Sequence, residues 1–182
     1  YISNEGRTVL YRNGELIGES EFGDGGSFEV PSEAAEYRIE LDHTQSMFEL
    51  TTQQRITWTF ESAHVAAGDA RLPLLVVRYT PELDERGRAP RGRDFCLPIS
   101  VQQFGRSSAP RSSDPTLDVS YDDGATWQPA RVERDGQNWK AWLEHPRRAE
   151  YVSLRASARD RHGNGVEHTV MRAYALGAQH GT

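Results

Sequence analysis

The sequence predicts an all-β protein made of two tandem antiparallel β-sandwiches. Apolar and polar residues alternate with a period of two along most of the chain, which is typical of strands that bury one face. Glycine, proline and asparagine separate the alternating runs at short intervals, as expected for turns between strands. The chain shows no sustained helical stripe, and residues 31–36 are the one place where a single helical turn is expected.

Residues 1–66 are predicted to form a small β-sandwich-like domain. Residues 7–20 read as a hairpin whose turn is Asn13-Gly14, the pair best suited to a type I′ turn because both positions need positive φ. The chain begins at Tyr1 without an initiator Met, so we expect a piece of a longer precursor and a first domain truncated at its N-terminus. Further alternating runs cover residues 37–41 and 56–60.

Residues 67–182 are predicted to form the second domain, after a boundary at residues 63–71, which are rich in small side chains. Seven short antiparallel strands in about a hundred residues are typical of an immunoglobulin-like or fibronectin type III-like sandwich. Residues 84–93 and 107–115 are expected to be mobile loops. The candidate strands lie near residues 73–79, 94–103, 116–122, 126–133, 138–144, 150–159 and 165–176.

Cys96 is the single cysteine, so the sequence offers no disulfide framework and no cysteine-rich metal site. Alternation places Cys96 on the polar face of its strand, together with Ser100 and Gln102. Two interpretations stay open: a partly covered, inert thiol, or a surface thiol that forms intermolecular disulfides. The opposite, apolar face holds Phe95, Leu97, Ile99 and Val101.

One short motif matches the Asp-box pattern S-x-D-x-G-x-T-W through Ser120, Asp122, Gly124, Thr126 and Trp127. The Asp carboxylate can cap turn amides, the glycine can adopt positive φ, and the tryptophan can pack over the turn. Sialidases carry several such boxes on propeller blades, away from the active site, whereas this chain has one copy. We therefore expect a structural hairpin, with a sugar- or ligand-contacting turn as the alternative.

Tyr121, Trp139 and Trp142 are the candidate binding residues. The two tryptophans lie three residues apart on one predicted strand, so they face opposite sides of it. One is expected in the core, and the other is a candidate platform for stacking on a sugar or a peptide, with Tyr121 nearby.

Charge and motif content exclude several classes of function. The 27 acidic residues outnumber the 21 basic ones, which argues against a nucleic-acid partner. No apolar run reaches the roughly 20 residues of a membrane-spanning helix. The six histidines show no metal-binding spacing, and Asp160 and Asn164 read as turn residues, because calcium needs more oxygen ligands. No catalytic motif appears, so we predict no catalytic residue, metal or cofactor.

The order of several motifs resembles the C-terminal region of large secreted subtilisin-like serine peptidases from high-GC bacteria. The resemblance covers most of the chain. The matching stretches are ITWTF at residues 56–60, LPLLVVRYTP at 72–81, VSYDDGATW at 119–127, YVSLRA at 151–156 and VMRAY at 170–174.

The resemblance implies an extracellular, secreted parent with a protease domain upstream in the same precursor. The family's catalytic Asp, His and Ser lie in that upstream domain, and no position here matches them. We therefore expect a non-catalytic accessory module that spaces, stabilises or docks the protease, onto protein substrate or cell-surface polysaccharide. The alternative is a carbohydrate-binding or adhesion module that uses exposed aromatics. A cryptic hydrolase is the third hypothesis, for which no residue spacing predicts a pocket.

Overall fold

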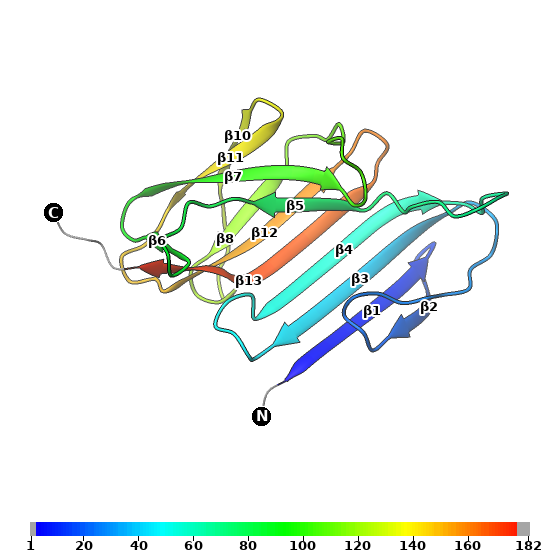
Figure 1. Ribbon diagram of the computed structural model, residues 1–182, viewed down its shortest axis with the longest axis horizontal. Coiled ribbons are helices and arrows are strands. Elements are labelled where there is room, and N and C mark those ends of the chain that lie inside the picture. The colour runs from blue at the N-terminus through cyan, green and yellow to red at the C-terminus, as the bar shows by residue number, and fades with distance from the viewer. Residues whose placement is uncertain (1–2, 178–182) are drawn as a thin grey trace.

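The computed structural model describes residues 3–177, and these form an all-β protein of two facing sheets (Figure 1). Sheet A runs in the order β2-β1-β3-β4-β13-β12-β8-β9, with β6 paired to β13, and sheet B runs in the order β10-β11-β7-β5. In this part of the chain, no helix is long and apolar enough to cross a membrane. The strands of sheet A are β1 Asn4–Arg12, β2 Glu15–Ser20, β3 Ala35–Gln45, β4 Gln53–Ser62, β6 Arg88–Pro90, β8 Thr116–Ser120, β9 Gln128–Pro129, β12 Tyr151–Arg159 and β13 Gly165–Gly177. Those of sheet B are β5 Leu75–Tyr79, β7 Asp94–Gln103, β10 Arg131–Asp135 and β11 Asn138–Glu144.

The main hydrophobic core lies where sheet B covers β8, β12 and β13 of sheet A. Strand β10 faces β8, and β5 faces β12 and β13. Leu75 and Leu97 of sheet B and Leu154 and Leu176 of sheet A are completely buried there. Alternation explains this core, because every second side chain of each strand points to the facing sheet.

The four N-terminal strands extend sheet A beyond the area that sheet B covers (Figure 1). Strand β4 pairs with β13 from Gln53↔Met171 to Thr59↔Gly165, so the sheet continues without a break between the two halves of the chain. The expected pair of tandem sandwiches is therefore not confirmed, because alternation predicts a buried face and not which strand will be the neighbour. The division into residues 1–66 and 67–182 stays a prediction.

A second, smaller cluster of buried side chains lies on the N-terminal strands and consists of Leu10, Ala35, Tyr37 and Phe60. The main core draws its buried residues from β5 onward, and Ile56 and Trp58 of β4 pack against its margin. Residues 3–177 thus form a main core between the two sheets and a smaller cluster on the N-terminal strands of sheet A.

The turn between β1 and β2 confirms the hairpin prediction, since Asn13 and Gly14 have φ values of 50° and 81°. The helical turn expected at residues 31–36 is wrong, because Ala35 and Glu36 already belong to β3. The Asn13 amide donates to the Glu36 carbonyl at 2.8 Å, and its side-chain oxygen accepts from the Glu36 amide at 3.1 Å. This pairing extends the β1–β3 ladder into the segment.

Two further expectations need correction. Residues 84–93 include a short strand, β6, which pairs in parallel with the end of β13. The single strand expected at residues 126–133 is split, because β9 pairs with β8 in sheet A and β10 pairs with β11 in sheet B. Pro129 ends the first of these, and the chain crosses between the sheets at Ala130, whose amide donates to the Leu117 carbonyl at 2.8 Å.

Candidate functional site

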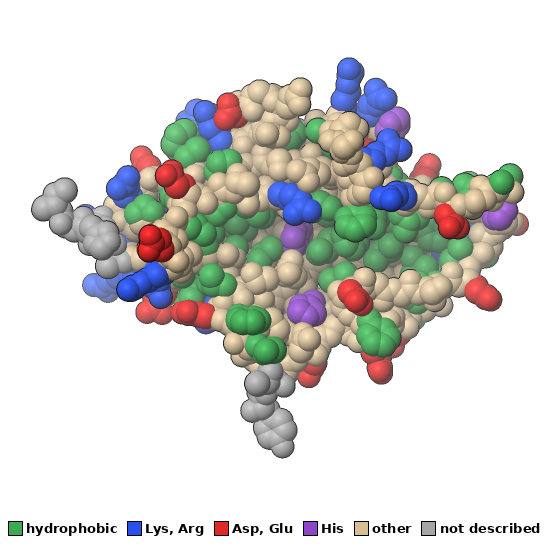
Figure 2. All heavy atoms as spheres, in the orientation of Figure 1, with side chains coloured by type: hydrophobic (Ala, Val, Ile, Leu, Met, Phe, Trp, Pro, Cys, Tyr) green, Lys and Arg blue, Asp and Glu red, His purple; other side chains and the backbone are tan. Residues whose placement is uncertain are grey.

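An open groove of about 1320 Å³ follows the uncovered face of sheet A, beside the edge strand β5. Figure 2 shows hydrophobic side chains gathered along this hollow, between the positions of β5 and β4 in Figure 1. The rim is formed by the loop around Phe28, the segment of residues 62–72 and the outer surface of β5. The floor consists of Tyr37, Ile39 and Leu41 of β3, Ile56, Trp58 and Phe60 of β4, and Val166 and His168 of β13.

The register of β3 and β4 produces this floor, because it sets the three apolar residues of one strand opposite those of the other. Tyr37 and Phe60 are buried, and their rings stack with centroids 5.9 Å apart. The other four side chains of the two strands are only half-buried. A contiguous apolar surface of this kind on a protein is typical of an interaction site.

The floor of the groove is uncharged at neutral pH. His168, at its margin, lies near Gln54, with 3.1 Å between Nε2 and the amide oxygen. Burial lowers the pKa of His168 below its ordinary value, so the ring is neutral at pH 7. Charged side chains lie on the rim instead, where Asp24, Asp69 and Arg78 line the groove.

Strand β5 is the edge of sheet B that borders the groove. Residues at even positions along this segment direct their backbone groups toward β7. The Leu74 carbonyl accepts from the Phe104 amide at 2.8 Å, and the Thr80 amide donates to the Pro98 carbonyl at 3.2 Å. In an antiparallel ladder the intervening residues direct their amides and carbonyls the other way. Trp58 Nε1 donates to the Leu75 carbonyl at 2.8 Å, which confirms this direction and ties β4 to β5.

The structure separates Trp139 from the other two predicted binding residues, Tyr121 and Trp142. Trp139 is 3% exposed and belongs to the main core, with its Nε1 donating to Asp114 Oδ1 at 2.8 Å. Trp142 is 44% exposed on the outer face of sheet B. The prediction that the two rings face opposite sides is therefore confirmed.

Trp142 and Tyr121 line a second pocket, of about 650 Å³, which is bordered by the end of β8, residues 128–131 and the end of β11. The Trp142 Nε1 donates to Glu133 Oε2 at 3.1 Å, and the Trp142 side chain remains partly open to solvent. The Tyr121 hydroxyl is buried without a hydrogen-bond partner, and burial is the main cause that raises its pKa. The hydroxyl of Tyr121 is thus not available to a ligand.

The Asp-box forms a tight turn held by its own side chains. Asp122 Oδ1 accepts from the Thr126 amide at 2.8 Å and from the Ser120 hydroxyl at 2.8 Å, while Oδ2 accepts from the Thr126 hydroxyl at 2.6 Å. The Gly124 amide donates to Ser120 Oγ at 2.9 Å, with φ at 84°. These bonds lower the pKa of Asp122, and they occupy the carboxylate that a ligand would need.

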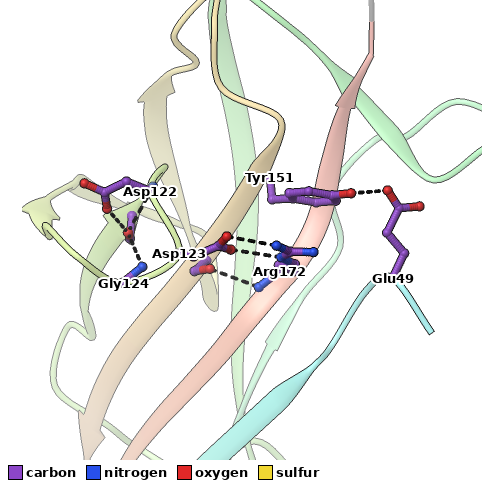
Figure 3. A network of polar contacts seen from close by, with 8 residues as sticks. Glu49, Asp122, Asp123, Gly124, Tyr151 and Arg172 are labelled. Atoms are coloured by element: carbon purple, nitrogen blue, oxygen red, sulfur yellow. Dashed lines mark hydrogen bonds and ion pairs between the residues drawn. The ribbon is translucent and has the colours of Figure 1, made fainter. Parts of the chain in front are cut away.

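Arg172 clamps the Asp-box onto sheet A (Figure 3). Its guanidinium donates two bonds of 2.9 Å to the Asp123 carboxylate and lies 4.1 Å from the centre of the Tyr151 ring, whose hydroxyl donates to Glu49. The Arg172 backbone has φ at 53° in a bulge of β13, and its amide donates to Ser153 Oγ at 2.9 Å. The network joins the β3–β4 turn, the Asp-box and β13. Its role is therefore structural.

The remaining residues discussed from the sequence, Cys96, Asp160 and Asn164, lie outside both pockets. Cys96 is a free, half-buried thiol on the outer face of β7, as the alternation predicts. Asp160 Oδ2 accepts from the Asn164 side chain at 2.8 Å within the turn between β12 and β13. In residues 3–177, no three His, Cys, Asp or Glu side chains gather where they could hold a metal ion.

The fold and the groove define a two-layer, all-β protein whose larger sheet is left partly open beside an edge strand. Comparison of the chain with protein-family models, with curated proteins and with solved structures found no match. The groove itself was missed by the sequence reasoning. The available signal was the apolar alternation at residues 37–41 and 56–60, which needs a facing layer that the first half of the chain does not supply.

Proposed function

We propose that this chain is a non-catalytic accessory module of a secreted subtilisin-like serine peptidase, and that its groove docks a polypeptide for the upstream protease domain. The motif order of the sequence supports the link to such a parent. The observation that carries the docking role is the half-buried apolar floor made by Ile39, Leu41, Ile56 and Trp58. The proposed setting is extracellular.

A polypeptide suits the groove better than a compact ligand. Side chains that follow one another along the floor, such as Ile39 and Leu41, lie two positions apart on a strand, or about 7 Å. Alternate side chains of an extended chain have the same spacing. The uncharged floor selects apolar side chains, and the rim offers charges of both signs to the polar ones between them.

Fluorescein-labelled casein, an unfolded protein, tests docking and catalysis with one probe. We expect saturable binding, seen as a rise in fluorescence anisotropy, without the dequenching that proteolysis produces. The double variant Ile39→Thr/Leu41→Thr places β-branched threonine, which suits a strand, at both positions of β3 and adds hydroxyls to the floor, so it should weaken binding at least several-fold. Glu40→Thr, on the opposite face of the same strand, is the matched control and should bind as the wild type does.

Two results would contradict the proposal. Equal binding by the wild type and the double variant would place docking elsewhere. Dequenching that a serine-directed inhibitor abolishes would show a peptidase in this chain and not in an upstream domain.

A carbohydrate-binding or adhesion module is the second candidate. The observation that favours it is the shared pocket of Trp142 and Tyr121, because an exposed indole beside a second ring is suited to stacking on sugars. A polysaccharide pull-down followed by a glycan array tests it. Saturable binding that Trp142→Ala removes and the floor variant leaves intact would favour this function over polypeptide docking.

A further inference from the structure

We propose that the groove receives its polypeptide as an added β-strand, which pairs with the outer edge of β5 and continues sheet B over β4 and β3. This inference rests on the proposed function and specifies how the polypeptide is held. It turns an apolar surface into a site with defined backbone partners, because strand addition supplies hydrogen bonds as well as apolar contact.

The layering of the two sheets sets the position of the added strand. Sheet B begins with β10 over β8 and ends with β5 over β12 and β13. Neighbouring strands lie about 4.8 Å apart and facing sheets about 10 Å apart. A strand added to β5 on its side away from β7 therefore lies above β4 and faces the apolar floor. Figure 1 shows β4 on that side of β5.

The backbone of Val77 supplies the central pair of hydrogen bonds. Val77 lies between Val76 and Arg78, which both line the groove, and it shares the outward direction of Leu75. Among the described residues, neither its amide nor its carbonyl has a partner on the outer side of β5. A residue of an incoming antiparallel strand can exchange both bonds with Val77. The Leu75 carbonyl is already occupied by Trp58, which limits pairing at that end.

The other sheet edges are blunted in ways that β5 is not. Strand β10 has four charged residues in its sequence RVERD, β9 contains Pro129, and β2 contains two glutamates. Strand β5, LVVRY, has one charged residue, Arg78. Charges and prolines are the usual means by which proteins prevent edge pairing. Pro73 and Pro81 flank β5 and have no amide hydrogen to donate. They therefore limit the length of edge that an added strand can pair with.

The surroundings predict the sequence pattern of the occupant. Its inward side chains meet Ile39, Ile56 and Trp58 and must be apolar. Its outward side chains lie beside the exposed Arg78 and favour polar or acidic residues. A short extended segment that alternates apolar and polar residues meets both requirements.

A backbone N-methylation scan tests strand addition on the unaltered protein. The probe is a capped, fluorescent peptide of eight alternating valines and threonines with a lysine at each end. Each derivative carries one N-methyl group, which removes one backbone donor. Binding by anisotropy should weaken about tenfold at the alternate amides that face Val77 and Tyr79 and change little at the other amides, because an antiparallel strand bonds to one neighbour through alternate residues and the Leu75 carbonyl is already occupied.

The outcomes separate the two proposals. A flat scan, with binding that Ile39→Thr/Leu41→Thr still removes, would overturn strand addition and leave polypeptide docking intact. Absence of saturable binding, or equal binding by wild type and double variant, would overturn both for this groove. Light scattering of the protein alone is the last arm, and a dimer that the double variant dissociates would show that a second copy, and not a separate polypeptide, fills the groove.

Discussion

At the scale of single residues, His145 is a histidine that the main core buries and fixes in one protonation state. It is 2% exposed, with Nδ1 3.0 Å from the Pro90 carbonyl and Nε2 3.0 Å from the Tyr174 hydroxyl. The carbonyl can only accept, so Nδ1 donates and the neutral ring accepts the Tyr174 proton at Nε2. Burial lowers the pKa of His145 below its ordinary value.

This geometry predicts that the protein loses stability in mild acid. The unfolded chain takes up the histidine proton near pH 6.5, and the folded chain does so only at lower pH. The free energy of unfolding should therefore be greatest above about pH 6.5 and fall as the pH is lowered further. Half-buried His168 acts in the same direction.

Urea unfolding between pH 5 and pH 8 measures this effect. His145→Gln should be less stable than the wild type at pH 8 but should show a flatter decline toward pH 5. His64→Gln replaces an exposed histidine and should follow the wild-type curve. If the free energy of unfolding of His145→Gln declined with pH as steeply as that of the wild type, the His145 ring would not be the source of the pH dependence.

Among the secondary-structure elements, β5 is the edge strand whose position depends on a side-chain hydrogen bond to the facing sheet. It pairs on one side with β7, and on the other its observed polar contact is the bond from Trp58 Nε1 to the Leu75 carbonyl. This bond fixes the distance between the edge of sheet B and β4, and it thereby fixes the width of the groove. The tryptophan thus serves as a floor residue and as a spacer between the two layers.

Trp58→Phe isolates the spacer role, because phenylalanine keeps an aromatic floor and loses the donor. We expect a loss of about 1 kcal/mol in the free energy of unfolding. Hydrogen exchange at the Val76 and Arg78 amides, which bond toward β7, should become faster. Trp142→Phe is the matched control, since its indole bonds to Glu133 at the surface, and it should change neither measurement. Unchanged exchange in β5 of the Trp58 variant would count against the spacer role.

At the scale of the whole molecule, the described residues bury one cluster between the two sheets and a smaller one on the N-terminal strands of sheet A. The larger cluster is built from residues after position 74, and the smaller one has four buried members on β1, β3 and β4. The smaller cluster has no second sheet above it, and a single layer rarely buries enough apolar surface to be stable alone. The N-terminal strands therefore depend on β13 more than the second half depends on them.

Truncation tests this dependence. Residues 67–182 should fold, melt at a lower temperature than the complete chain, and self-associate, because the loss of β4 exposes the edge of β13. Residues 1–66 should lack cooperative unfolding. Circular dichroism melting and size-exclusion chromatography of the two fragments measure both expectations. A cooperative transition in residues 1–66 would instead support an independent first domain.

Local alternation and turn chemistry were sufficient to predict the β class, the Asn13-Gly14 turn, the apolar face of β7 and the opposite directions of Trp139 and Trp142. These features depend on period and backbone φ, which are properties of short segments. The partner of β4, the split of residues 126–133 between two sheets and the strand β6 depend on contacts between distant segments. Alternation leaves such pairings open.

The groove shows the same division. The sequence by itself determined that Ile39, Leu41, Ile56 and Trp58 share one apolar face, because side chains on a strand alternate. The tertiary structure alone decided that sheet B ends at β5 and leaves this face uncovered. That outcome depends on how many strands each sheet receives, which is a property of the complete set of pairings and not of any one strand.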